Sequence, residues 1–469
     1  MDLYSTLNSL APKISYLNRD FNHHHQHDDQ SIDENPKDFP PTEDPVYILG
    51  KKYSSLYELN EIRSDVRSNI WMTYRRNFPP IGDTNFTSDS GWGCMLRCGQ
   101  MVLARAFINL YLGRNWHWNY TNLESIKQLL QDDNETELKK YLIYKNILKM
   151  FTDQKTSSYS IHQIALMGVC EGKNVGQWFG PNTIAQVLRK LSLFDKMSDV
   201  FIYVAMDNIV FLDDIKKSCK INDDDDDDDE TKCQEITSKW KPLILFIPLR
   251  LGLTEINPVY FRALKTTFTF PQTLGILGGR PNHALYFIGC CGDDLIYLDP
   301  HTTQPNVNIV AQDREYLEQI LNEEIQNDLL LDISSNNDQC ITSLSQQSTD
   351  DISYHCERPY RMSISLLDPS LSLCFFCKNE EEFNHWTRLT MEKLFHEQTQ
   401  PLFEIMQTRP REWQNNDDDD NDLEFIASSS SSSKLINQSF VHKNIPNDLA
   451  QQTSDVDNNV DDDEEFEII

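Results

Sequence analysis

The chain has 469 residues, which is enough for one large domain with insertions or for two domains. Only 39% of the residues are hydrophobic and the formal net charge is -31, with much of the excess acid in Asp223–Glu230, Asp417–Asp420 and the C-terminal end. We therefore expect the acidic excess to lie in unpacked tails and inserts. Nucleic acids and anionic membranes both require a positive footprint, so neither is an expected direct partner.

The sequence predicts a cytoplasmic protein with reduced thiols. No apolar run approaches the ~20 residues needed to span a bilayer, and the N-terminus has neither a basic nor an apolar leader segment. The cysteine count is odd, at 11, and the spacings indicate no disulfide framework. Cys374 and Cys377 form a CxxC pair without a second pair at zinc spacing, so we expect buried thiols and no metal site. No cofactor is expected.

Changes in composition divide the chain into three parts. Residues 1–43 form a polar arm that includes the tract His23–His27, and we expect this arm to be disordered. Residues 44–412 carry dense apolar patterning, interrupted by an acidic insert near 221–235 and a polar insert near 306–353, where Tyr316–Leu331 is a possible helix. Residues 413–469 form an acidic, serine-containing tail that we also expect to be disordered.

The dense region predicts helices first and a sheet later. Met95–Leu112 has helical apolar spacing throughout and predicts a long, mostly buried helix. Gly180 and Pro181 indicate the start of a second helix. Three apolar runs predict strands, and the last two flank a hairpin turn at 291–294: Pro242–Leu249, Ala284–Cys290 and Leu295–Asp299. This order favours an α+β fold over an alternating parallel sheet.

Cys94 is the candidate nucleophile. It follows Gly91-Trp92-Gly93 directly and precedes the long predicted helix. The glycines allow a tight turn, and the positive end of a helix favours thiolate over thiol. The alternative is a small residue packed at a helix start, and the local pattern does not decide between the two. Cys98, one turn further along, is expected to be a core thiol.

A cysteine nucleophile needs a base and a group that orients the base. Asp299 and His301 lie two residues apart at the end of a predicted strand, so both side chains point to one face and the carboxylate can reach the imidazole. An isolated Asp-Pro-His would be a simple strand end, but a candidate nucleophile in the same chain favours the catalytic interpretation. Tyr74 is one of several tyrosines that could help to stabilise an oxyanion.

These residues lie in segments that resemble the autophagins, the cysteine proteases that process the GABARAP-like ubiquitin-like modifiers of autophagy. The stretch Thr73–Gln100 (TYRRNFPPIGDTNFTSDSGWGCMLRCGQ) resembles the signature of that family. Further segments agree with the family in order: Asp44–Tyr53, Gly176–Leu188, Pro248–Asn257, Gly278–Gly289, Leu295–Gln304 and Ser363–Cys377. The resemblance covers residues 44 to about 412 and omits the inserts.

The resemblance implies a papain-like core with a small helical insertion near 118–195. It implies that Cys94 is the nucleophile, His301 the general base, Asp299 its orienting group and Tyr74 an oxyanion donor. Trp178 matches a tryptophan that covers the active-site cleft, and Pro281 matches a regulatory loop that lies against that tryptophan until substrate enters. Such an enzyme cleaves after the modifier's C-terminal glycine, to mature the precursor and to release the modifier from phosphatidylethanolamine.

The last residues of the chain resemble a short motif that docks on these modifiers. Phe466 and Ile469 follow an acidic run with the spacing of an aromatic and an aliphatic residue that fill two pockets. The alternative is an acidic tail that ends in apolar residues by chance. The membrane would be reached only through the conjugated modifier, which is the expected partner.

Two other functional classes stay open at this point. A thiol acyltransferase or transglutaminase-like enzyme would use the same cysteine and histidine, although such enzymes usually place the histidine and aspartate well apart. A catalytically silent binding protein would capture modifiers through its tails, although all three residue types of a catalytic triad are present. The leading hypothesis is a cytoplasmic cysteine protease.

Overall fold

A computed structural model describes residues 39–119, 135–195, 198–221, 239–307, 309, 350–397 and 400–410. The arm at 1–38, most of the acidic and polar inserts, the possible helix Tyr316–Leu331 and the tail after 410 lie outside the described residues. The main unit extends to Arg409. None of the described helices is both long and apolar enough to cross a bilayer.

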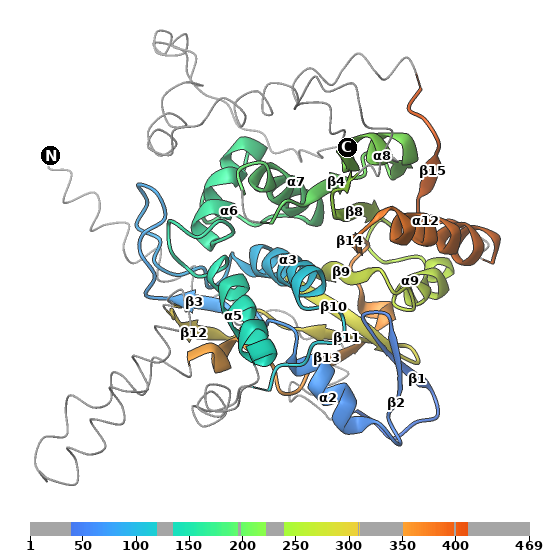
Figure 1. Cartoon of the computed structure of the whole chain (residues 1–469), viewed down its shortest axis with the longest axis horizontal. Helices are drawn as coiled ribbons and strands as arrows, with labels where there is room; N and C mark the ends of the chain where they lie inside the picture. Colours follow the sequence, from blue (N-terminus) through green and yellow to red (C-terminus); the bar gives the residue numbers. More distant parts are fainter. Residues whose placement is uncertain are drawn as a thin grey trace, which may run out of the picture. The chain divides into compact units, whose positions relative to one another are not determined.

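Helices and strands alternate irregularly along the chain (Figure 1). The helices are α2 (Leu59–Arg67), α3 (Cys94–Tyr111), α5 (Glu135–Lys149), α6 (Ile161–Met167), η1 (Gly168–Glu171), α7 (Pro181–Ser192), α8 (Leu212–Cys219), η2 (Pro258–Tyr260), α9 (Phe261–Thr267), η3 (Asp350–Tyr354), η4 (Ile364–Leu366), α12 (Glu380–Leu389) and the π-helical η5 (Thr390–His396). The larger strands are β4 (Phe201–Val204), β8 (Leu243–Arg250), β9 (Thr273–Arg280), β10 (His283–Cys291), β11 (Asp294–Leu298), β13 (Tyr360–Ser363) and β14 (Ser370–Cys377). The remaining strands are β1 (Pro45–Ile48), β2 (Lys51–Ser54), β3 (Tyr74–Arg76), β5 (Ile209–Phe211), β6 (Lys220–Ile221), β7 (Lys239–Trp240), β12 (Thr303–Pro305) and β15 (Glu404–Met406).

One large sheet organises the described residues. Its strand order is β13-β11-β10-β9-β14-β8-β4, and β1, which also pairs with β2, joins it through β10. Only β4 runs parallel to its neighbour, β8; the other pairs are antiparallel. The first half of β10 pairs with β9 and its second half with β1, so a single strand links the two.

Both faces of this sheet are buried. Along β8, the side chains of Ile244 and Phe246 enter one hydrophobic core, and those of Leu245 and Ile247 enter the other. The first core contains α3, α5, α6 and α7, and the second contains α8, α9 and α12. In Figure 1, α5, α6 and α7 lie around α3, and α9 and α12 lie apart from them. Strands covered on both faces read as continuous apolar runs, which is the pattern of Leu243–Leu249.

The prediction of an α+β fold is confirmed. The long helix expected at Met95–Leu112 is α3, Cys94–Tyr111, and the second helix begins at Pro181 with Gly180 as its N-cap. The predicted strands appear as β8, β10 and β11, and the turn between the last two contains Gly292, whose positive φ of 58° favours glycine. Cys374 and Cys377 are buried in β14, as predicted.

Candidate functional site

Asp299 and His301 form a close pair immediately after β11. The His301 Nδ1 atom lies 2.6 Å from Asp299 Oδ1, and the His301 backbone N–H donates to the same oxygen at 2.9 Å. The carbonyl of Asp299 accepts the indole N–H of Trp71 at 2.7 Å. The backbone and the side chain of Asp299 are therefore both fixed by hydrogen bonds. This geometry agrees with the prediction that the carboxylate reaches the imidazole.

Cys94 is the first residue of α3, and its side chain contacts His301 of the Asp299–His301 pair. Its sulfur is in hydrogen-bond contact with the His301 imidazole, the Ala284 backbone and the Tyr74 hydroxyl. Cys94 is only 6% exposed. Among the described residues no side chain caps the N-terminus of α3, so the positive end of the helix acts directly on the thiolate.

The protonation states of these groups depend on one another. Burial opposes ionisation of the Cys94 thiol, but the hydrogen bonds from His301, Ala284 and Tyr74 outweigh it and lower the pKa of Cys94 below its ordinary value. Burial also disfavours the His301 imidazolium, but the contacts with Asp299 and Cys94 raise the pKa of His301 to about 9. The arrangement therefore favours the thiolate–imidazolium pair over the neutral thiol and imidazole.

Asp299 stays ionised beside this pair. Burial alone would raise its pKa, but the contacts with His283 and His301 hold the pKa of this carboxyl well below its usual range. Cys98 differs, because complete burial raises the pKa of its thiol well above the ordinary value. Its predicted place in the core is confirmed.

A buried ion triad that the sequence analysis missed holds the turn before Cys94. The Asp89 carboxylate accepts from Arg97 Nε at 2.7 Å and from the Arg75 backbone N–H at 2.7 Å, while Arg97 Nη1 donates to Asp153 at 2.8 Å. The Asp89 carbonyl accepts the Gly93 N–H at 2.8 Å. Arg97 and Arg105, two charged residues in a mostly apolar helix, were the available signal, because a buried charge requires a partner.

Gly93 is required by this turn. A Cβ atom at residue 93 would lie 2.4 Å from Asp89 Oδ2, closer than non-bonded atoms approach. Gly91 has a φ of 87°, in the left-handed region that favours glycine. The two glycines therefore act differently, one by leaving space and the other by its backbone conformation.

Tyr74 lies against both Cys94 and His301. Its ring meets the His301 ring edge to face, with centroids 5.3 Å apart, and its hydroxyl contacts the Cys94 sulfur. Burial, with the neighbouring thiol, raises the pKa of Tyr74, so the phenol keeps its proton and can donate it in a hydrogen bond. Parallel pairing of β3 with β12, in register Tyr74 to Thr303, fixes the tyrosine beside the histidine loop.

Trp178 and Pro281 lie on two loops at this site. The Trp178 side chain is 51% exposed, and its indole N–H donates to the Gly91 carbonyl at 2.6 Å, which anchors the ring to the turn before Cys94. Pro281 is exposed in the two-residue turn between β9 and β10, three residues before Ala284. Whether Pro281 moves with Trp178 stays a prediction.

His283 is a neighbour of the pair to which the sequence analysis gave no role. Its ring is stacked on the His301 ring, with centroids 3.5 Å apart and an interplanar angle of 5°. Its Nε2 atom lies 3.8 Å from Asp299 Oδ2, which is too long for a hydrogen bond.

His283, Asp299 and His301 also place their ligand atoms within 4.8 Å of one another, close enough to consider a metal ion. An imidazole coordinates a metal in its ring plane, and the parallel planes of the two rings do not converge on one point. His301 Nδ1 is in addition hydrogen-bonded to Asp299. The cluster therefore fits a hydrogen-bonded acid–base site better than a metal site.

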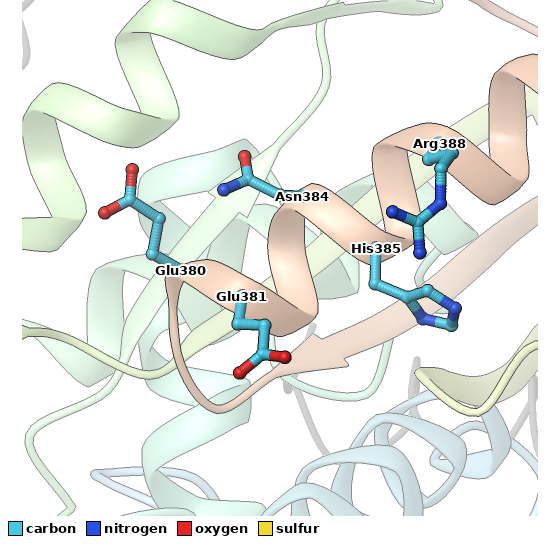
Figure 2. Close-up of a pocket in the computed structure, with 5 residues that line it drawn as sticks. All are labelled: Glu380, Glu381, Asn384, His385 and Arg388. Carbon is cyan, nitrogen blue, oxygen red and sulfur yellow. The ribbon is translucent and has the colours of Figure 1, made fainter.

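A separate polar pocket lies on α12 (Figure 2). Its lining residues are Glu380, Glu381, Asn384, His385 and Arg388. Other side chains of α12, including Phe383 and Trp386, pack in the core on the sheet face opposite α3. The pocket is therefore on the other side of the sheet from Cys94 and contributes nothing to the site.

Phe466 and Ile469, the two residues predicted to dock on the modifier, lie outside the described residues.

Comparison with known proteins identifies the family of the chain. The family described as the Peptidase C54 catalytic domain matches residues 59–389, more than half of the chain. The chain is 44% identical over 396 residues to the cysteine protease ATG4B of Gallus gallus, covering 81% of this chain and 88% of that protein. It is 43% identical over 386 residues to the cysteine protease ATG4B of Xenopus laevis, covering 81% and 87%.

A third relative extends the same result. The chain is 42% identical over 391 residues to the cysteine protease ATG4A of Homo sapiens, covering 80% of this chain and 85% of that protein. The matched region includes the Cys94 turn, the β10–β11 hairpin and the Asp299–His301 pair. The resemblance to the autophagins and the papain-like fold class are confirmed. The chain belongs to the Peptidase C54 family, the autophagins, and is a cysteine protease.

Proposed function

We propose that this protease cleaves after the C-terminal glycine of a GABARAP-like ubiquitin-like modifier. It would act on the precursor, to mature it, and on the lipid conjugate, to release the modifier from phosphatidylethanolamine. The observation that carries the proposal is the contact of the Cys94 sulfur with the His301 imidazole at an uncapped helix N-terminus. The substrate class comes from the family resemblance.

In the proposed reaction the Cys94 thiolate attacks the carbonyl carbon of the glycine. The new C–S bond places negative charge on the carbonyl oxygen, and the Tyr74 hydroxyl with the backbone N–H of Cys94 would stabilise that charge. The His301 imidazolium gives its proton to the leaving nitrogen as the C–N bond breaks. Asp299 keeps the imidazole in one tautomer and orientation throughout, supported by the 2.6 Å contact to Nδ1.

The second half of the reaction returns the enzyme to its starting state. Neutral His301 removes a proton from water, the resulting hydroxide attacks the thioester, and the Cys94 thiolate leaves. The same residues serve both substrates, because a peptide and the phosphatidylethanolamine conjugate are both amides of the glycine carboxyl group. In this reaction water accepts the acyl group from Cys94, whereas in a thiol acyltransferase another nucleophile would accept it.

Trp178 and Pro281 are proposed to control entry to the site. An extended tail ending in glycine would pass beneath the exposed indole of Trp178, which excludes bulkier side chains, and the Pro281 turn would move as the tail enters. Closure over the tail would remove water from around the thiolate. The indole's 2.6 Å hydrogen bond to Gly91, close to Cys94, supports this role.

The proposed division of the chain is a protease domain at 44–412 between a polar arm at 1–43 and an acidic tail at 413–469. Within the domain, the inserts near 221–235 and 306–353 and the helical insertion near 118–195 are additions to the core. Phe466 and Ile469 are proposed to dock on the modifier as an added strand. The proposed location is the cytoplasm, with the membrane reached through the conjugated modifier.

The first experiment is cleavage of a GABARAP-like precursor that carries a C-terminal extension, with product masses recorded. We expect wild type to cut directly after the glycine and Cys94→Ala to lose at least about 10³-fold in rate, because the nucleophile is removed. Cys170→Ala is the matched control, since Cys170 is an exposed thiol on η1 and should not affect cleavage. The lipid-conjugated modifier on vesicles is tested with the same variants.

Three results would contradict the proposal. Hydrolysis by Cys94→Ala at the wild-type rate would remove Cys94 from the mechanism. Transfer of the modifier to an added amine in preference to water would identify an acyltransferase. Binding without any cleavage, abolished by deletion of Phe466–Ile469, would identify a modifier-binding protein.

A further inference from the structure

His283 has no part in the mechanism above, yet it contacts both residues that act with Cys94. It is the first residue of β10, next to Ala284, whose backbone contacts the Cys94 sulfur. Its ring covers one face of the His301 ring at 3.5 Å and is nearly parallel to it. Its Nε2 atom faces the Asp299 oxygen that His301 leaves unused, Oδ2, at 3.8 Å.

The orientation of the His283 ring has an electrostatic reason as well as a packing one. His283 Nε2 is buried and has no hydrogen-bond partner within 3.5 Å among the described residues. A buried N–H group without a partner costs free energy unless a charge compensates it, and the Asp299 carboxylate is the charge that it faces. The turn before β10 fixes this orientation, because Arg280 and His283 are paired across the hairpin.

We propose that His283 is a positioning residue for the reaction, which holds the His301 ring by stacking on its face and stabilises the charge of the Asp299 carboxylate with its Nε2–H group. The inference rests on the proposed function, because it assigns a role within the same site. It names a residue that acts through Asp299 and His301 and does not touch the substrate.

The ring of His283 and its Nε2–H group act on different residues: the ring contacts His301, and the N–H group faces Asp299. His301 is held at Nδ1 by Asp299, which leaves the ring free to tilt about that hydrogen bond. Tyr74 meets one part of the ring edge to face, and His283 covers a face at stacking distance, so the two neighbours together restrict the tilt. The His283 N–H group, 3.8 Å from Asp299 Oδ2, stabilises the negative charge on the carboxylate through space.

Loss of His283 therefore has a predictable effect on the proton at His301. Water entering the vacated space would weaken the attraction between Asp299 and the imidazolium, because the local dielectric rises. The charged and titratable groups around the two rings are Asp299, Cys94, Tyr74 and Arg280. None of these replaces the ring face that His283 supplies, so the imidazolium should lose its proton at a lower pH in the variant.

Three variants of His283 separate the two contacts, and a fourth variant serves as the control. His283→Ala removes both, His283→Phe keeps an aromatic face without the N–H group, and His283→Gln keeps an N–H donor without the ring. His385→Ala is the matched control, because His385 is a partly exposed histidine on α12, across the sheet from Cys94. Each variant is assayed for precursor cleavage against pH and for alkylation of Cys94 by iodoacetamide against pH, with the adduct located by peptide mass.

We expect His283→Ala to lower kcat on the order of tenfold with KM changed less than about twofold, since misplaced catalytic groups slow the reaction without altering substrate contacts. The alkaline limb of its kcat profile should move to lower pH. His283→Phe and His283→Gln should each recover part of the rate, and His385→Ala should match wild type.

Two outcomes would overturn the proposal. One is wild-type kcat and an unchanged alkaline limb in His283→Ala. The other is a fall in kcat with an unchanged alkaline limb and no recovery in the Phe and Gln variants, which would indicate a structural role only. The alkylation profile needs no protein substrate, so it tests His283 even if the proposed modifier is not cleaved.

Discussion

At the scale of single residues, Cys94 and His301 each stabilise the charged form of the other. The imidazole lowers the pKa of the Cys94 thiol, and the thiolate contributes to raising the pKa of His301 to about 9. Asp299 makes the largest favourable contribution to the second shift. The pair is therefore charged in the window above the Cys94 pKa and below about 9.

This window predicts a bell-shaped dependence of kcat/KM on pH. The rate should rise as Cys94 loses its proton, at a pH lower than for an ordinary cysteine, and fall as His301 loses its proton near pH 9. The measurement is initial-rate cleavage of the precursor between pH 4 and 10, combined with the alkylation of Cys94.

His301→Gln is the variant that tests the cause of the shift. Without the imidazole, the main contact that opposes the effect of burial on the Cys94 thiol is lost, so the pH midpoint of Cys94 alkylation should move upward. Cys94 alkylation that keeps its wild-type midpoint in this variant would show that the helix N-terminus, and not His301, controls the thiol.

At the scale of an element, the start of α3 depends on a turn that has room for no Cβ atom at residue 93. Gly93 is the N-cap of α3 and has an ordinary φ of -84°, so the requirement comes from Asp89 and not from the backbone conformation. Asp89 in turn holds Arg97, which binds Asp153. The position of Cys94 is therefore linked to a buried ion triad.

Gly93→Ala should accordingly destabilise the protein by about 1–3 kcal/mol and slow the alkylation of Cys94, because Asp89 must move away from Arg97. Thermal unfolding and alkylation at pH 7 measure the two effects.

Gly180→Ala is the matched control for that substitution. Gly180 is the N-cap of α7, and a Cβ atom there meets nothing within 4 Å. Equal losses of stability in the two variants would mean that the cap position, and not the contact with Asp89, determines the effect.

At the scale of the main unit, a buried polar network joins the segment after the polar insert to α5 and to the end of α2. His355 Nδ1 lies 2.7 Å from the Arg67 carbonyl oxygen, and its Nε2 lies 2.7 Å from the Tyr144 hydroxyl. Trp118 stacks on the same ring at 3.8 Å, and Lys145 pairs with Asp351 at 3.3 Å. These contacts hold residues that are far apart in the sequence.

Complete burial lowers the pKa of His355 to about 4. The unfolded chain, with an ordinary histidine pKa of about 6.5, binds more protons than the folded state between these values, so stability should fall as the pH drops through this window. From pH 7 to pH 5 this one group should reduce the free energy of unfolding by about 2 kcal/mol.

Urea unfolding at pH 7 and pH 5 measures this effect against His355→Phe, which keeps a ring against Trp118 and removes the titrating group. The variant is expected to be less stable at pH 7 but to lose less stability on acidification. An equal loss in both proteins would assign the acid sensitivity to other groups.

The sequence by itself determined the local features of this protein. Helix α3, the hairpin of β10 and β11 and the Asp299-Pro300-His301 segment all follow from neighbouring residues, because apolar periodicity, turn glycines and strand alternation act over a few positions. The triad types and the family resemblance were also readable, as were the buried thiols of β14.

The tertiary structure alone decided how these pieces meet. Strand order, the insertion of β14 between β8 and β9, the Asp89–Arg97–Asp153 triad and the stack of His283 on His301 join residues whose separation gives no local pattern. A charge that is buried without a partner costs free energy, so burial in the covered sheet makes a partner necessary. Which residue becomes that partner depends on how the elements pack against one another.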